Sequence, residues 1–289
     1  MKRKIFQVDA FTSKPYCGNP AGVVIDAVGL TDEQMMLIAK EMKLSETAFV
    51  FPGSTGYDFE VRFFTPTEEV DLCGHATIAT FSLLKELGII NKEEVIQKTK
   101  AGLLNIKFLG NGMVIMQQAP PLIIAREIML DELCKIMGIR NTDVGISELM
   151  LLPEIWSTGL KDILLPVKSI DVLKGMSPSM DELIDYSRKM DVSGAHVFTI
   201  GEENTIWCRN FAPLCGIPEE SATGTSNGAL GACLYNKGWH EALSFTSHQG
   251  YWLGSPSQIF VQVQNGSNPE VWVGGKAVTV LDGEIVIPE

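Results

Sequence analysis

The feature that most constrains the fold is an internal repeat, in which both halves of the chain carry one pattern with different chemistry. The first half contains RFFTP at residues 62–66, then DLCGHAT at 71–77, which opens a helix-like stretch that stops at Gly88. The second half contains RNFAP at 209–213, then ATGTSN at 222–227, which opens a similar stretch that also stops at a glycine. A duplicated chain of this kind usually folds as two similar lobes with a cleft between them.

The repeat also predicts where a ligand binds. Aligning Gly74 with Gly224 aligns their neighbours as well, Cys73 with Thr223 and His75 with Thr225. A glycine at a helix start leaves backbone N–H groups able to face an anion. Two such helix starts facing one cleft predict a carboxylate site. We therefore expect Cys73, Gly74, Thr223 and Gly224 to contact the substrate.

Length and periodicity predict the fold class. A chain of 289 residues is typical of about two domains. The break at Pro120-Pro121 divides it into an N-terminal lobe, 1–121, and a C-terminal lobe, 122–289. Many short strand-like runs and one long apolar helix per half predict an α+β fold with two pseudo-symmetric lobes. In each lobe we expect a strongly curved, barrel-like sheet around a central helix.

Charge and composition exclude several classes of partner. The net charge of −12 argues against nucleic acid and anionic membrane surfaces, because both need clustered Lys and Arg. No apolar core follows the basic residues 2–4, which argues against secretion, and no run approaches the ~18 apolar residues that span a bilayer. The six cysteines lack C-x2-C pairing, as expected for reduced thiols in a cytoplasmic protein.

Glu46 and His75 are the candidates for acid–base chemistry. Glu46 precedes the apolar run 48–51. A carboxyl group in an apolar setting has a raised pKa and can both donate and accept a proton near neutrality; a surface carboxylate at a strand end is the alternative. His75 lies in the first turn of the predicted helix, where the dipole disfavours the imidazolium. We expect a neutral imidazole that donates a hydrogen bond or relays a proton, or one that is only structural.

Cys73 is placed like a reactive thiol, because a helix start lowers a thiol's pKa. Its repeat partner is Thr223, whose hydroxyl does not ionise near neutral pH, so a symmetric two-thiol mechanism is absent. A buried, inert cysteine is therefore the favoured alternative. Asn19 is first a turn residue, in Gly18-Asn19-Pro20, and second a ligand contact.

Cofactor motifs are missing from the sequence. No His, Cys, Asp or Glu cluster has metal-ligand spacing, which predicts no metal. Gly22, Gly74 and Gly224 form neither G-x-G-x-x-G nor G-x-x-x-x-G-K, which predicts no nucleotide or flavin cofactor.

Short motifs occur in a fixed order along nearly the whole chain. The first half has DAF at 9–11, GNPAGV at 18–23, SETAF at 45–49 and CGHAT at 73–77. The second half has Arg209, FAP at 211–213, GI at 216–217, ATG at 222–224, QG at 249–250 and VGG at 273–275. As an ordered set, these motifs resemble the PhzF family of phenazine-biosynthesis-like isomerases.

This resemblance implies the diaminopimelate-epimerase-like fold, no cofactor and a homodimer. The activity characterised in the family is isomerisation of a dihydro-3-hydroxyanthranilate, in which a proton moves along a conjugated ring system. The family's proton-carrying glutamate matches Glu46, and its assisting histidine matches His75. The family's second-lobe motif reads EDPATGS, whereas residues 219–225 read EESATGT. The functional Asp is therefore replaced by Glu220 and the functional Ser by Thr225, and both changes take room from the pocket.

The sequence thus predicts a cytoplasmic, cofactor-independent isomerase, similar to trans-2,3-dihydro-3-hydroxyanthranilate isomerase, for a small carboxylate-bearing substrate. Glu46 would carry the proton, while His75, Glu220 and Thr225 would hold the substrate or relay protons. One alternative is an amino-acid racemase or epimerase of the same fold, which needs an ionisable group on each face of one carbon. The other is a non-catalytic protein that binds a small ligand.

Overall fold

The computed structural model describes residues 2–146, 149–239, 243–266 and 269–287. The chain forms two compact units: unit 1 comprises Met1–Gln117 with Gly274–Glu289, and unit 2 comprises Gln118–Val273. The division expected at residue 121 placed the C-terminal segment in the second lobe, whereas here Gly274–Glu289 belongs to unit 1. That segment belongs to unit 1 because β18 (Ala277–Val286) pairs with β1 (Lys2–Ala10) in an antiparallel ladder.

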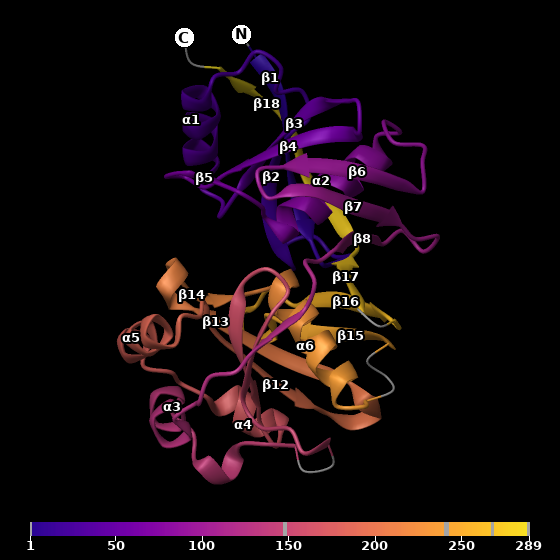
Figure 1. Ribbon diagram of the computed structural model, residues 1–289. Coiled ribbons are helices and arrows are strands. Elements are labelled where there is room, and N and C mark those ends of the chain that lie inside the picture. The colour runs from indigo at the N-terminus through magenta and orange to yellow at the C-terminus, as the bar shows by residue number, and fades with distance from the viewer. Residues whose placement is uncertain (1, 147–148, 240–242, 267–268, 288–289) are drawn as a thin grey trace. The chain divides into compact units, whose positions relative to one another are not determined.

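In its described residues, unit 1 contains one mixed sheet and the helices α1 and α2 (Figure 1). Its strand order is β18, β1, β2, β3, β4, β6, β7, β8, with the short β5 on β4. The remaining elements in chain order are β2 (Asn19–Val24), α1 (Asp32–Met42), β3 (Thr47–Ser54), β4 (Tyr57–Phe64), β5 (Glu69–Val70), α2 (Gly74–Glu86), β6 (Glu94–Thr99), β7 (Gly102–Phe108) and β8 (Val114–Gln117). The pairs β2–β3 and β4–β6 are parallel, and the other neighbours are antiparallel.

Unit 2 repeats this plan. Its sheet runs β9, β10, β11, β12, β13, β15, β16, with β14 on β13, and β11–β12 and β13–β15 are the parallel pairs. The strands are β9 (Leu122–Ile124), β10 (Glu154–Ser157), β11 (Lys161–Pro166), β12 (Gly194–Ile200), β13 (Ile206–Ala212), β14 (Ile217–Glu220), β15 (Ser244–Gln249), β16 (Ser257–Gln264) and β17 (Glu270–Gly275). The α-helices are α3 (Leu130–Met137), α4 (Ile170–Gly175), α5 (Met180–Met190) and α6 (Gly224–Asn236). The equal order and direction of the strands confirm the predicted α+β class.

Each unit buries one central helix against its own strands. Both α2 and α6 have 13 residues and begin at the glycine that the repeat identified. α2 packs on β1, β2, β3, β8 and β18, and α6 packs on β10, β11 and β16. Helices that are apolar on all sides are buried ones. A Cβ on Gly231 of α6 would lie only 2.6 Å from Val261 Cγ1, so the helix approaches β16 this closely because that position is glycine.

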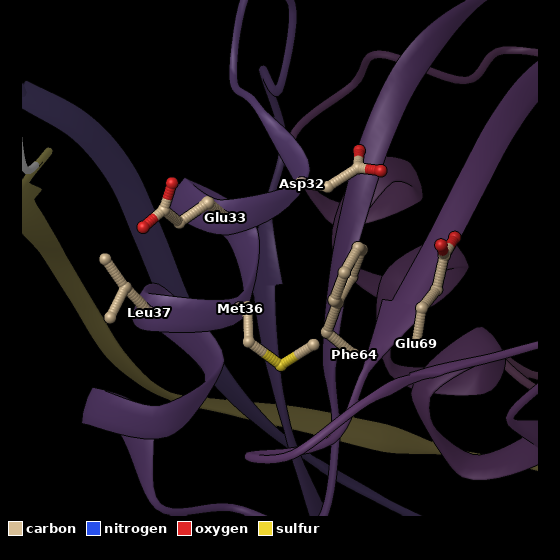
Figure 2. Close-up of a pocket in the computed structure, with 6 residues that line it drawn as sticks. All are labelled: Asp32, Glu33, Met36, Leu37, Phe64 and Glu69. Atoms are coloured by element: carbon tan, nitrogen blue, oxygen red, sulfur yellow. The ribbon is translucent and has the colours of Figure 1, made fainter.

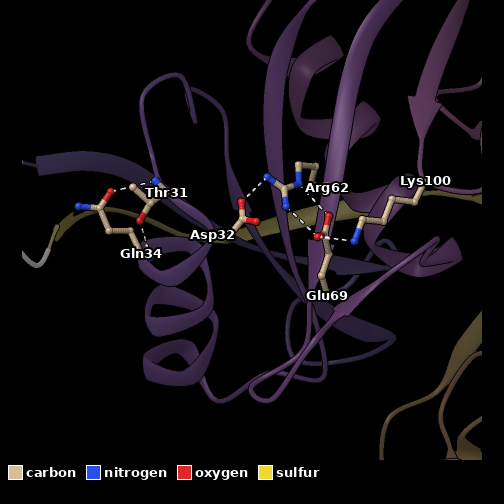
Figure 3. A network of polar contacts seen from close by, with 6 residues as sticks. All are labelled: Thr31, Asp32, Gln34, Arg62, Glu69 and Lys100. Atoms are coloured by element: carbon tan, nitrogen blue, oxygen red, sulfur yellow. Dashed lines mark hydrogen bonds and ion pairs between the residues drawn. The ribbon is translucent and has the colours of Figure 1, made fainter.

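Helix α1 covers a separate cluster of buried residues in unit 1. α1 begins with a capping box, in which Thr31 accepts from the backbone N–H of Gln34 and the Gln34 side chain accepts from the Thr31 N–H (Figure 3). Its buried Met35 packs with Phe49 and Phe64. Within the part of the chain that the structure describes, no helix is both long and apolar enough to cross a membrane.

Candidate functional site

Glu46 is fixed directly before β3 by the neighbouring strand β2. Its carbonyl oxygen accepts a hydrogen bond from the Gly22 N–H at 3.1 Å, and Gly22 is in register with Thr47. A Cβ on Gly22 would lie 2.7 Å from Thr47 Oγ1, so the strands can approach this closely only because residue 22 is glycine. The Glu46 side chain is 16% exposed, and its Oε2 atom is buried without a hydrogen-bond partner among the described residues.

His75 lies beside this carboxylate. It is the second residue of α2 and is buried, and its Nε2 atom lies 3.3 Å from Glu46 Oε2. Burial lowers the pKa of His75, and the nearby Glu46 carboxylate only partly opposes that effect. The imidazole is therefore neutral at pH 7, with Ser45 Oγ 3.4 Å from the same nitrogen.

Cys73 completes the cluster in unit 1. It precedes α2 as the N-cap residue, no side-chain hydrogen bond caps that helix, and its Sγ atom lies 3.4 Å from His75 Nδ1. Donor atoms of Glu46, Cys73 and His75 all lie within 4.8 Å of one another. The sequence predicted no metal-ligand cluster because β3 brings Glu46 to α2 from far along the chain, which spacing alone does not reveal.

In unit 2 the structure brings Glu220 and Thr223 together. The Thr223 hydroxyl donates to Glu220 Oε2 at 2.9 Å, and Gln249 Nε2 donates both to Thr223 Oγ1 at 3.0 Å and to the Glu220 carbonyl at 2.8 Å. Asn227 Nδ2 donates to Gln249 Oε1 at 3.0 Å. Sequence reasoning assigned no role to Gln249 or Asn227, although the QG motif at 249–250 was a signal that could have identified Gln249.

Thr225 is the second residue of α6 and lies against the loop between β10 and β11. Its carbonyl accepts from Thr158 Oγ1 at 2.8 Å, and a Cβ on Gly159 would meet its methyl group at 3.2 Å. The next residue, Ser226, donates from Oγ to Asp162 Oδ2 at 2.5 Å. Asp162 is fully buried, and burial raises its pKa to about 6. Sequence reasoning missed this carboxyl group.

Asp162 should make stability depend on pH. Because its pKa is raised on folding, its favourable contribution is present at low pH and is lost as pH rises through about 6. Asp162→Asn keeps an oxygen that can accept from Ser226 but carries no charge. We expect the variant to become more stable relative to the wild type between pH 4.5 and 7.5, as measured by urea unfolding at several pH values. A difference between the two proteins that does not change with pH would contradict this.

In both units an Arg–Glu pair fixes the short strand that precedes the central helix. In unit 1, Arg62 of β4 forms two hydrogen bonds of 2.7 Å with Glu69 of β5, and Asp32 and Lys100 join the network (Figure 3). In unit 2, Arg209 of β13 pairs with Glu219 of β14 at 2.8 and 2.7 Å. Such bidentate pairs fix geometry more strongly than single contacts. They therefore position the short strands that lead into α2 and α6.

Asn19 and a surface hollow are further features of unit 1. Asn19 is the first residue of β2, buried and in register with Ala10. A surface hollow of about 370 Å³ lies beside α1 (Figure 2), and it is lined by Asp32, Glu33, Met36, Leu37, Phe64 and Glu69. None of the predicted site residues lines this hollow. It is an acidic and apolar surface, separate from the candidate chemistry.

The duplicated architecture defines a fold that other proteins share. A hydroxyproline epimerase from Agrobacterium vitis has the same fold, with a TM-score of 0.62 over 98% of this chain and 92% of that one at 14% identity. Among proteins of this fold the chain belongs to the PhzF family, because the family model for phenazine biosynthesis-like proteins, PhzC-PhzF, matches residues 8–283.

Relatives of full length agree with this assignment. An uncharacterized isomerase of Clostridium acetobutylicum and the uncharacterized isomerase YddE of Escherichia coli K12 are each 35% identical, over 99% of both chains. The crystal structure of a PhzF-family protein from Bacillus anthracis matches with a TM-score of 0.89 at 30% identity, over 99% of this chain and all of that one. The protein is an isomerase of this family.

Proposed function

We propose that this isomerase moves a proton between carbon atoms of a small carboxylate-bearing substrate without a cofactor, as a dihydro-3-hydroxyanthranilate isomerase does. Glu46 is the proton carrier. The observation that carries the proposal is Glu46 Oε2, a buried carboxylate oxygen that has no hydrogen-bond partner among the described residues and lies 3.3 Å from a neutral imidazole. A carboxylate that no donor occupies keeps its lone pairs for a proton from the substrate.

The reaction then needs two proton transfers. Glu46 takes a proton from one carbon, the electron pair moves along the conjugated system, and the same carboxyl group returns the proton to another carbon. The neutral His75 imidazole donates a hydrogen bond or relays a proton beside it. The N–H groups at the start of α2, which no side chain caps, bind the substrate's carboxylate.

In unit 2, we assign substrate binding to the start of α6 and to its neighbours Glu220 and Thr225. No side-chain hydrogen bond caps α6 either. The Thr223 hydroxyl and Gln249 hold Glu220 in place by hydrogen bonds. The methylene that Glu220 has in addition to the family's Asp therefore changes the shape of the site and does not make the side chain more mobile. Together with the methyl group of Thr225, this favours a substrate that differs in shape from the family's phenazine precursor.

Exchange with solvent tests the proposal. Trans-2,3-dihydro-3-hydroxyanthranilate and a panel of smaller unsaturated carboxylates would be incubated with the protein in D₂O, and the recovered compounds analysed by NMR. A compound that binds and gains carbon-bound deuterium supports proton transfer. A compound that binds tightly but gains no deuterium and is not isomerised supports a non-catalytic ligand-binding protein instead.

Cys73→Ser separates this mechanism from thiol-based racemisation. The repeat position equivalent to Cys73 holds Thr223, whose hydroxyl is hydrogen-bonded to Glu220, so the repeat supplies no second thiol. We expect the variant to lose less than about a hundredfold in turnover, roughly 2.7 kcal/mol of barrier. Steady-state kinetics measure the loss, with the substrate that the exchange experiment in D₂O identifies. A larger loss, in a variant with unchanged thermal melting, would support the racemase alternative.

The family resemblance also leads us to propose a homodimer, and the cysteines without C-x2-C pairing lead us to propose that it is cytoplasmic. Light scattering coupled to gel filtration measures the mass in solution. A single species with the mass of one chain would contradict the dimer.

A further inference from the structure

We propose that Glu46, Cys73 and His75 form a binding site for Zn²⁺, and that zinc bound there inhibits the enzyme. Metal binding itself goes beyond the proposed function and does not depend on it. The inhibition rests on the proposed role of Glu46.

The three side chains have the chemistry that zinc prefers. Zn²⁺ binds cysteine sulfur, histidine nitrogen and carboxylate oxygen, most often with four ligands in a tetrahedron. His75 supplies an imidazole nitrogen, Nε2, that lies 3.3 Å from Glu46 Oε2. Glu46 Oε2 has no hydrogen-bond donor among the described residues that a metal would have to displace. A bound cation would also compensate a carboxylate that is largely removed from water.

The distances fit a common metal ion. In a tetrahedral zinc site the Zn–S, Zn–N and Zn–O bond lengths place neighbouring ligand atoms about 3.4–3.6 Å apart. Here Glu46 Oε2 and His75 Nε2 are 3.3 Å apart, and Cys73 Sγ and His75 Nε2 are 3.9 Å apart. All three donor atoms lie within 4.8 Å of one another. The Glu46–His75 distance already suits a shared metal ion. Rotation of the Cys73 side chain would bring its sulfur into the same coordination sphere, with a fourth position for water.

All three ligands lie at the start of a helix or strand. Cys73 and His75 flank the first residue of α2, and Glu46 directly precedes β3, where its backbone is hydrogen-bonded to Gly22. Preorganised ligands reduce the ordering that binding requires. The zinc would occupy the oxygen that we propose as the proton carrier, so substrate turnover and zinc binding exclude each other.

Cobalt and zinc titrations test the site without substrate. The protein would carry Cys17→Ser and Cys215→Ser, because these are the cysteines with exposed surface outside the cluster. Co²⁺ added to this chelator-treated protein should give one equivalent of binding with a thiolate-to-cobalt charge-transfer band, and Zn²⁺ should displace it. A further Cys73→Ser change should abolish the band. His75→Gln and Glu46→Gln should each weaken Zn²⁺ binding by at least about tenfold.

A second measurement uses the wild-type sequence, so that it does not depend on the folding of variants. Zn²⁺ should slow alkylation of Cys73 by iodoacetamide at least about tenfold, followed by mass spectrometry of the Cys73 peptide, and should leave the rate at Cys215 unchanged. A charge-transfer band that survives Cys73→Ser, or alkylation of Cys73 that zinc does not slow, would overturn the site. Neither result would affect the proposed isomerase function. Zinc that binds here without reducing turnover would overturn the inhibition.

Discussion

Replacing Glu46 with glutamine is expected to reduce turnover by about 10²–10⁴-fold, the range typical of lost general acid–base catalysis. Glutamine keeps the shape of the side chain but cannot carry a proton. Its contact with His75, 3.3 Å in the wild type, can persist between the two uncharged groups. Ligand affinity should therefore change little. Turnover and binding would be measured on one preparation, with a thermal melt to confirm folding.

Glu41→Gln is the matched control. It removes the same charge from an exposed position on α1, close to Glu46 in sequence, and should leave turnover unchanged. If Glu46→Gln retains activity near that of the control, Glu46 is not the proton carrier. If turnover and binding are lost together, Glu46 acts in substrate binding rather than in proton transfer.

The second large effect is expected on stability, from Glu219→Gln. Arg209 pairs with Glu219 through two hydrogen bonds, both side chains are nearly buried, and Arg209 Nη1 also donates to the carbonyls of Leu173 and Met176. These contacts hold the guanidinium in place, so it cannot turn to water when its partner loses its charge. Breaking a buried ion pair in this way costs about 3–5 kcal/mol. We expect a decrease in the free energy of unfolding at the lower end of that range.

Urea unfolding followed by circular dichroism measures this decrease. Asp185→Asn is the control, because it breaks an exposed pair with Arg188 whose expected contribution is at most about 1 kcal/mol. Equal and small effects of the two changes would show that the Arg209–Glu219 pair does not hold β14 to β13. A large effect confined to Glu219→Gln supports that role.

The sequence was most informative where the signal is local. Glycines 74 and 224 begin the two central helices as predicted, because a small residue at a helix start and an apolar run after it are properties of a few adjacent positions. The capping box at Thr31, which starts α1, is a local signal of the same kind, because it depends on residues only three positions apart. The strand order of the two units agrees because it derives from one repeated pattern.

Contacts between residues far apart in the sequence could not be predicted from sequence patterns and motif spacing. The cluster of Glu46, Cys73 and His75 depends on β3 reaching the start of α2. The burial of Asp162 depends on the packing of β11 against α6. Periodicity describes which residues face a core, but not which polar side chains from separate elements meet there. The expected division placed residues 277–286 in the C-terminal lobe for the same reason, because their partner strand β1 is at the opposite end of the chain.

That pairing of β1 with β18 has a consequence for biosynthesis. At ribosomal rates of 5–20 residues per second, roughly 10–50 s separate the synthesis of the two strands. During this interval one edge of β1 has no partner, and open edges invite pairing with other chains. Lys2 and Lys4 lie on this edge, and lysines are charges that discourage such pairing. When β18 arrives, Glu284 and Asp282 bind these lysines at 3.0 and 2.8 Å, so the side chains that protect the nascent strand also select its final partner.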